Sequence, residues 1–143
     1  MKTRIESRIG IQAPTDDIWP LIETLGDWGR WNDVEREVSG TIAFGGAIAM
    51  TEHFEGLEPR AVNGKVVEWQ PHAQLVIAEK RGLWFNTLRY FEIEQLEPGN
   101  CIFATGMIFN GLRAEMYHDK HRRLIKTAYA GLCDKVKLLA ESR

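Results

Sequence analysis

The chain has 143 residues, of which 44% are hydrophobic and 27% charged, and its formal net charge is −2. This length predicts a single domain with a core of its own, and this composition excludes a disordered chain. Lysine and arginine are interspersed with acidic residues rather than clustered as phosphate binding requires, so nucleic acid is not expected as a partner.

The N-terminal segment, residues 3–12, predicts a half-buried β-strand. Isoleucines occupy positions 5, 9 and 11, and mostly polar residues occupy the even positions, which is a period of two. Pro14 ends this strand, and apolar residues at helical spacing follow it. Because Pro20 is tolerated only in the first turn of a helix, we expect the helix cap at Asp16 or Asp17.

Three of the five tryptophans lie close together around this first helix. Trp19 belongs to the apolar stripe of the helix and is expected in the core. Asp27 caps a second short helix, which carries Trp28 and Trp31 on one side, three residues apart. An indole is large and has one polar N–H, so these two suit the boundary between a cavity and water, and they equally suit a packed core.

From Val34 to Asn110 the sequence predicts six β-strands joined by short loops. Turn signals stand at Gly45-Gly46 and in the segments "QPHA" and "EPGN". Short connections predict antiparallel pairing in a meander.

The C-terminal segment predicts one long amphipathic helix from near Glu115 to near Ala140. It contains no proline, and its apolar residues recur every three or four positions. The expected buried stripe comprises Tyr117, His121, Leu124, Ala128, Leu132, Val136 and Leu139. Charged residues fill the other side, so the helix is expected to bury one face.

The order of these elements and three segments carry a resemblance to a known family. The segments are "IQAPTDDIWPLIETLGDWGRWN" at 11–32, "VVEWQPHAQL" at 66–75 and "FEIEQLEPGN" at 91–100. Over essentially its whole length the chain resembles the START/Bet v 1-like (SRPBCC) superfamily, and within it the polyketide cyclase/dehydrase-like branch.

The resemblance implies a single helix-grip domain over residues 1–143, of the α+β class. In this fold a seven-stranded bent antiparallel sheet wraps around a long C-terminal helix, two short helices lie between strands 1 and 2, and a cavity separates sheet from helix. The superfamily includes lipid carriers, hormone receptors, aromatase/cyclases, quinone-binding proteins and chaperone activators. No catalytic motif is common to them, so candidate site residues are assigned from strand alternation alone.

Glu52 is the first candidate, because it shares a strand face with Ile48, Met50 and Phe54. If that face lines the cavity, Glu52 is a carboxylate in apolar surroundings and a candidate general acid/base or ligand anchor. The alternatives are a strand-end glutamate that reaches water at the cavity mouth and a bulge that turns the side chain outward.

Arg89 is the second candidate, because it shares a face with Phe91 on another predicted strand. It is the expected partner of Glu52 or of an acidic ligand group, and the alternative is a solvated arginine whose stem lies on the sheet. On the strand over residues 61–69, the set of Val67 and Trp69, rather than the set of Val66 and Glu68, is expected to face inward, since a large ring is costly to leave in water.

The side chains expected to contact a ligand are Trp28, Trp31, Ile48, Met50, Phe54, Trp69, Ile77, Phe91, Met107 and Phe109. Together they predict an apolar hollow of roughly a few hundred cubic ångströms, the usual size of a small-molecule site. His118 and His121 have a spacing that could bind a metal but lack a third ligand, so no metal is expected, and no motif indicates a cofactor.

The first hypothesis for function is the binding or carriage of a small hydrophobic molecule, such as a polyketide, a quinone or a lipid-like compound. The second is a polyketide cyclase/dehydratase-type enzyme, in which Glu52 moves a proton and Arg89 steadies an enolate. The third is a protein-interaction module that uses the basic run "KHRRLIK" at 120–126, and a homodimer is a further open alternative.

The expected location is the cytoplasm. The segment "MKTRIESRIG" lacks the apolar core of a signal peptide, and the two cysteines form no CxxC motif. No apolar run approaches the roughly 18 residues of a membrane span, so no integral membrane association is expected.

Overall fold

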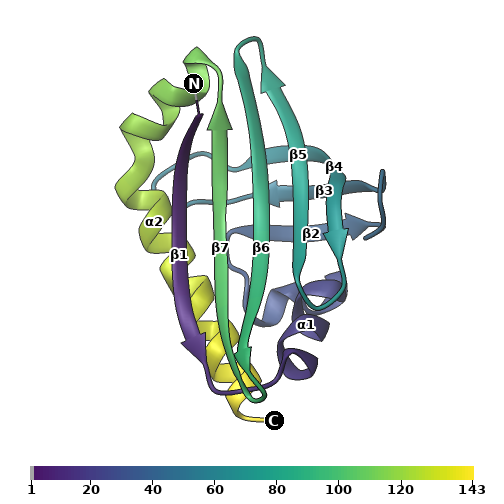
Figure 1. Ribbon diagram of the computed structural model, residues 1–143. Coiled ribbons are helices and arrows are strands. Elements are labelled where there is room, and N and C mark those ends of the chain that lie inside the picture. The colour runs from purple at the N-terminus through teal and green to yellow at the C-terminus, as the bar shows by residue number, and fades with distance from the viewer. Residues whose placement is uncertain (1) are drawn as a thin grey trace.

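The computed structural model describes residues 2–143 and shows a seven-stranded antiparallel sheet bent around a long C-terminal helix (Figure 1). The elements are β1 (Lys2–Ile11), α1 (Thr15–Glu23), the 3-10 helix η1 (Leu25–Arg30), β2 (Glu35–Gly40), β3 (Ala47–Glu52), β4 (Arg60–Gln70), β5 (Gln74–Gly82), β6 (Phe85–Glu97), β7 (Asn100–Asn110) and α2 (Leu112–Glu141). Within the sheet the strands lie in the order β1-β7-β6-β5-β4-β3-β2. From β2 onward each strand pairs with the next one in the chain, as short loops allow, and β1 pairs with β7. The predicted helix-grip fold of the α+β class is confirmed.

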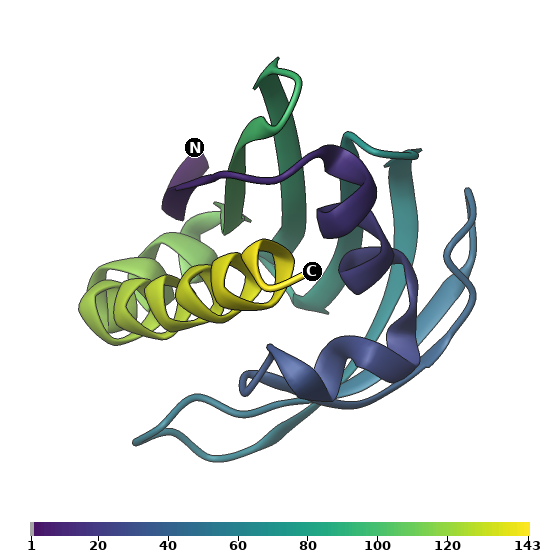
Figure 2. The same ribbon diagram turned by 90° about the horizontal axis from the view of Figure 1, so that it is seen from below.

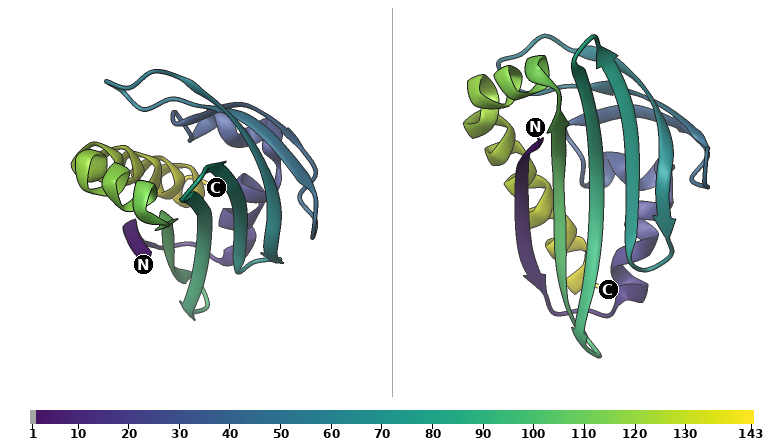
Figure 3. Two further views of the ribbon diagram at one scale, coloured as in Figure 1. Left: turned by 90° about the horizontal axis from the view of Figure 1, so that it is seen from above. Right: turned by 45° about the horizontal axis from the view of Figure 1, so that its top comes forward.

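The curvature of the sheet creates a concave side that the helices cover (Figure 2). α2 packs mainly on β1 and β7, at one edge of the sheet. α1 and η1 link β1 to β2, the two edge strands, and α1 lies beside the C-terminal part of α2 (Figure 3). The core therefore lies between the sheet on one side and α2 with the two short helices on the other.

α1 differs from the expectation at its start. It begins at Thr15, with Pro14 as an extended N-cap residue and no side-chain cap, so the predicted cap at Asp16 or Asp17 is wrong. The Pro14 carbonyl accepts a hydrogen bond from the Asp17 N–H and starts the first turn instead. Pro20 thus lies inside the helix, where its missing N–H leaves the carbonyl of the exposed Asp16 to be solvated by water.

α2 begins at Leu112, three residues before the predicted start, because another part of the chain caps it. The Trp84 carbonyl, in the turn between β5 and β6, accepts hydrogen bonds from the N–H groups of Arg113 (3.1 Å) and Ala114 (3.3 Å). Gly111 makes this close approach possible: its φ is +109°, and a Cβ there would lie 2.3 Å from the Trp84 oxygen. A long-range contact therefore sets the start of the helix.

The buried face of α2 is also rotated relative to the prediction. Its buried residues are Ala114, Ile125, Tyr129, Leu132, Cys133, Val136 and Ala140. Of the predicted stripe, Leu132 and Val136 are buried and the other members are half-buried. Contact with β1 and β7 decides which arc of the helix is covered, and the apolar periodicity is compatible with several neighbouring arcs. Among residues 2–143, no helix is long and apolar enough to cross a bilayer.

β4 contains an irregularity that puts two sets of side chains on the concave side. Val66 pairs with Ile77, but Glu68 pairs with Val76, so Val67 is an extra residue in the ladder. Before this bulge the buried valines of β4 face inward, and after it Trp69 does so opposite Leu75. Trp69 faces inward as predicted and is half-buried, but Val66 of the set that was expected to face outward is buried too, because the bulge interrupts the alternation.

Candidate functional site

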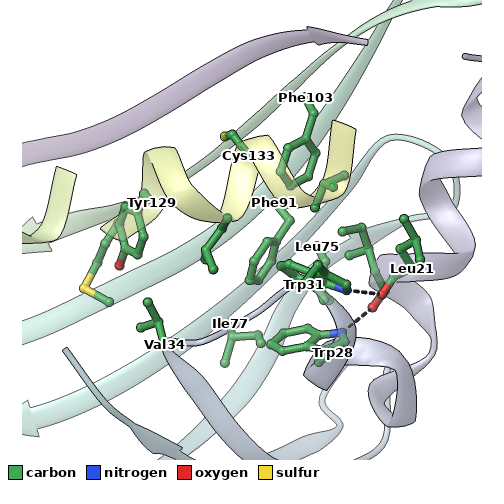
Figure 4. Packing of buried hydrophobic residues seen from close by; sticks show 14 of the residues in the cluster. Leu21, Trp28, Trp31, Val34, Leu75, Ile77, Phe91, Phe103, Tyr129 and Cys133 are labelled. Carbon is green, nitrogen blue, oxygen red and sulfur yellow. Dashed lines mark hydrogen bonds between the residues drawn. The ribbon is translucent and has the colours of Figure 1, made fainter. Parts of the chain in front are cut away.

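Two tryptophans form a dry aromatic cluster with Phe91 at one end of the concave side (Figure 4). The Trp28 and Trp31 ring centroids are 5.3 Å apart, and Phe91 lies 5.0 and 5.8 Å from them in edge-on contacts. Each indole N–H donates to a backbone carbonyl of α1: Trp28 to Ile22 (2.9 Å) and Trp31 to Leu21 (3.0 Å). With all polar atoms satisfied and at most 1% of the surface exposed, both indoles belong to the packed core.

Glu52 faces the interior, as strand alternation predicts, and is 4% exposed. Its partner is not Arg89, and that expectation is wrong. Arg81 holds both carboxylate oxygens of Glu52, with Nη1 donating at 3.1 Å and Nη2 at 2.6 Å. Burial acts to lower the pKa of the Arg81 guanidinium, but the carboxylates of Glu52 and Glu79 outweigh it and keep that pKa above its ordinary value. Arg81 is therefore a permanent cation inside the protein.

Arg89 is also buried, and its carboxylate partner is Glu35. Nε donates to Glu35 Oε2 at 2.5 Å and Nη2 to Oε1 at 3.2 Å, while Nη1 donates to the Thr105 hydroxyl and to the backbone carbonyls of Tyr90 and Gly106. Burial acts to lower the pKa of Arg89, and Glu35 more than restores it. This pair leaves no guanidinium nitrogen without an acceptor.

Aromatic rings and an amide complete the surroundings of this pair. The guanidinium carbon of Arg89 lies 4.3 Å from the Phe91 ring centroid and 4.2 Å from that of Tyr129. The Asn32 side chain donates to Glu35 Oε1 at 2.8 Å. Phe91 thus joins the aromatic cluster to the charged part of the core.

A third pair closes the network toward the surface. Arg60 donates to both oxygens of Glu79, at 2.9 and 2.6 Å, and its Nε lies 3.7 Å from Glu52. Arg81 Nε lies 3.3 Å from Glu79, so the Glu52–Arg81 and Arg60–Glu79 pairs are in contact. We call these six side chains the charge network; they are Glu35, Glu52, Glu79, Arg60, Arg81 and Arg89. Their formal charges sum to zero.

Strand register explains why these residues meet. Glu52 pairs across the ladder with Glu35 on β2 and with Arg60 on β4, which places all three at one level of the sheet. Arg81 lies on the inward face of β5 with Ile77 and Glu79, at the point where the pairing with β6 shifts register. Sequence reasoning missed Glu35, Glu79, Arg60 and Arg81, yet the spacing of positions 77, 79 and 81 on one strand face was a usable signal.

The interior of the grip is nearly filled. The pocket there has a volume of about 10 Å³ and is lined by Glu35, Met50, Glu52, Val62, Ile77, Glu79, Arg81, Thr87, Arg89 and Met107. The predicted apolar hollow of a few hundred cubic ångströms is therefore wrong for the interior pocket that these residues line. Long side chains, chiefly the two buried arginines and the two methionines, occupy the space between sheet and helix. The remaining volume is about that of one water molecule.

The other predicted ligand contacts lie in the same core but do not surround one hollow. Ile48 is buried, and Phe54 packs on Tyr129 with centroids 6.0 Å apart. Phe109 packs on Tyr117 at 6.1 Å, and Trp69 contacts Phe44 at 6.5 Å. Their role as ligand contacts stays a prediction. No group of three or more histidine, cysteine or acidic side chains that could hold a metal ion occurs within residues 2–143.

The architecture of this chain is similar to that of several solved structures. Zhui aromatase/cyclase from Streptomyces sp. R1128 matches with a TM-score of 0.75 at 14% identity, over 100% of this chain and 96% of that one. Truncated norcoclaurine synthase from Thalictrum flavum matches with a TM-score of 0.73 at 14% identity, over 100% and 96%. The di-domain aromatase/cyclase StfQ of the steffimycin pathway matches with a TM-score of 0.78 at 11% identity, over 100% of this chain and 52% of that one.

This chain has a Bet v 1-like fold. No protein-family model and no curated protein matches its sequence. At such low identity the similarity concerns the Bet v 1-like backbone alone, and the charge network is argued from this chain's own residues.

Two surface grooves approach the interior of this Bet v 1-like domain. One, of about 390 Å³, is lined by Glu55 in the loop after β3 and by Arg123, Leu124, Thr127 and Ala128 of α2. The other, of about 410 Å³, runs along η1 and β2, and Glu35 contributes to its lining. Glu35 therefore lines both an outer groove and the interior pocket.

Proposed function

We propose that this protein binds a small molecule with an apolar body and a polar or charged group, inside the grip beside the Glu52–Arg81 pair. The observation that carries the proposal is the charge network in an otherwise apolar core. Removing charges from water costs several kcal/mol per ion, and apolar side chains of similar volume would stabilise a fold of this kind as well or better. Perturbed, buried charged groups of this sort concentrate at functional sites.

Entry of a ligand requires the closed interior to open. The loop over residues 53–59 covers one side: Phe54 contacts Tyr129, and the added Cβ of Gly56 would meet Leu124 at 3.5 Å. The groove between this loop and α2 marks the seam along which the two separate. Displacement of Phe54 would open the space beside Met50 and Glu52, where a polyketide, a quinone or a lipid-like body fits chemically.

Saturable binding of a fluorescent apolar probe tests the proposal. We expect tryptophan emission to change with the same midpoint, because Trp28 and Trp31 contact Phe91 and, through it, the charge network. Native mass spectrometry of protein purified from the cells that produce it should then show a bound small molecule. A titration without saturation, together with a ligand-free native spectrum, would contradict the proposal.

A second candidate function is an enzyme in which Glu52 exchanges a proton with a bound substrate. It is favoured by the position of Glu52 on the interior pocket, and similar folds occur in an aromatase/cyclase and in norcoclaurine synthase. Both oxygens of Glu52 accept hydrogen bonds from Arg81, so proton transfer would require Arg81 to move first. Arg89 is fully engaged by Glu35, Thr105 and backbone carbonyls, which makes it a poor partner for an enolate. Ligand binding is therefore the stronger proposal.

A further inference from the structure

The charge network has one arginine that is partly exposed to water, Arg60. Its side chain is 37% exposed, whereas those of Arg81 and Arg89 are 4% exposed. Its Nε is buried and has no hydrogen-bond partner within residues 2–143. Arg60 is also the first residue of β4, next to the loop over residues 53–59 that covers the interior. Of the three guanidinium groups, that of Arg60 requires the least free energy to move out of the network into water.

The two carboxylates beside Arg60 keep a partner when it leaves. Glu52 retains both hydrogen bonds from Arg81, and Glu79 retains Arg81 Nε at 3.3 Å. The position that Arg60 vacates lies between two carboxylates. Without Arg60, the charge network has a net charge of −1. A position between two buried carboxylates strongly favours a cation, and it disfavours an anion by repulsion and by the cost of desolvation.

The core beside the Glu35–Arg89 pair also contains a buried hydroxyl that has no partner among the described residues. Tyr129 is 0% exposed, and its hydroxyl has no hydrogen-bond partner in the part of the chain that the structure describes. Burial raises the pKa of this phenol, and Arg89, whose guanidinium carbon lies 4.2 Å from the ring centroid, acts to lower it. A buried hydroxyl without a partner costs about 1–3 kcal/mol, and a polar atom of a bound molecule would remove that cost.

We propose that the Arg60 guanidinium marks a cation subsite, and that the ligand is a small molecule whose protonated amine or guanidine replaces Arg60 between Glu79 and Glu52. The inference rests on the proposed function and specifies its ligand class. Replacement keeps the charges of the network balanced at zero, whereas an anionic ligand would add an unpaired buried charge. The ligand's apolar body lies against Tyr117 and Phe85, whose rings are 5.3 Å apart and flank Arg81 at 5.7 and 5.5 Å.

A matched series of probes tests the subsite: hexylamine, 1-hexanol and hexanoate, each titrated into the full chain and followed by tryptophan emission and thermal shift. We expect hexylamine to bind at least about tenfold more tightly than the other two, because charge-assisted hydrogen bonds to carboxylates are strong. In Arg60→Met, which removes the competing guanidinium, hexylamine should bind more tightly still. Arg122→Met removes an exposed arginine of α2 outside the network and should leave binding unchanged.

The carboxylate side of the subsite is tested by Glu79→Gln, which should weaken hexylamine binding by about tenfold or more. If this variant unfolds, methylguanidinium with Arg60→Met serves instead: it should raise the melting temperature of Arg60→Met more than that of the wild type. Equal or tighter binding of 1-hexanol or hexanoate would overturn the subsite and leave small-molecule binding intact. The subsite is also overturned if no member of the series binds although the fluorescent apolar probe binds. If the fluorescent apolar probe does not bind either, the proposed function itself is overturned.

Discussion

The two ends of the concave side differ in how their buried groups are held. At the end near α1 and η1, Trp28, Trp31 and Phe91 pack ring against ring, and each indole N–H has a backbone acceptor. At the end near the first half of α2, six charged side chains hold one another in pairs. Arg89 and Phe91, two residues apart on β6, are where these ends meet.

This difference indicates which part of the core contributes only to the stability of the fold. In the aromatic end each group contributes its own burial and hydrogen bond, so the loss of one leaves the others in place. In the charged end each group is tolerated only because its partner is present, so the loss of one exposes the other to the full cost of an unpaired buried charge. The first arrangement suits a permanent core, and the second suits a place where partners can be exchanged.

The largest expected effect comes from breaking the most buried pair. Arg89→Met should lower the free energy of unfolding by about 3–5 kcal/mol, because Glu35 is then a buried carboxylate without a cation. The double variant Glu35→Leu with Arg89→Met should recover most of this loss, since both charges are gone. Urea denaturation of the two variants and the wild type measures this, and a double variant no more stable than Arg89→Met would contradict the account.

A smaller loss of unfolding free energy is expected at the aromatic end. There, a second substitution added to a Trp31 variant should not restore stability. Trp31→Phe removes the hydrogen bond to Leu21 and part of a buried ring, which should cost about 1–3 kcal/mol. Trp84→Phe is the matched control, because Trp84 is 63% exposed, and it should change stability by less than about 0.5 kcal/mol. Equal denaturation midpoints for the two variants would show that Trp31 is not held as the structure indicates.

The smallest effect at neutral pH is expected at Tyr129, whose ring centroid lies 4.2 Å from the guanidinium carbon of Arg89. Burial raises the pKa of all three tyrosines above its ordinary value, so they bind their protons more tightly when folded than when unfolded. Their contribution to stability is therefore complete below about pH 10 and falls as the pH rises further. Tyr129→Phe should reduce this alkaline loss, and at neutral pH it should raise the free energy of unfolding by about 1 kcal/mol, because it removes a buried hydroxyl that has no partner among the described residues.

Tyrosinate absorbance followed together with circular dichroism checks this expectation. Ionisation of the tyrosines should coincide with unfolding in the wild type. Tyrosinate that forms near pH 10 while the fold stays intact would mean that the phenols are accessible to water.

The sequence by itself determined the elements of this protein and the side of the sheet on which Glu52 lies. Both depend on local periodicity: a strand that buries its apolar residues at every second position must also bury a glutamate that stands in that series. The resemblance to the START/Bet v 1-like superfamily supplied the arrangement of sheet and helix, which backbone comparison confirms.

Only the tertiary structure decided what Glu52 is paired with and how much space remains beside it. The pairing depends on cross-strand register and on the bulges in β2, β4 and β5, which single-residue shifts in hydrogen bonding create and alternation does not reveal. The space beside Glu52 depends on the way in which long side chains from five strands, Arg81 and Arg89 among them, fill a common volume. Local sequence limits which groups face the interior, but the contacts of distant segments determine which charges meet there and which member of the network stays close enough to water to be replaced.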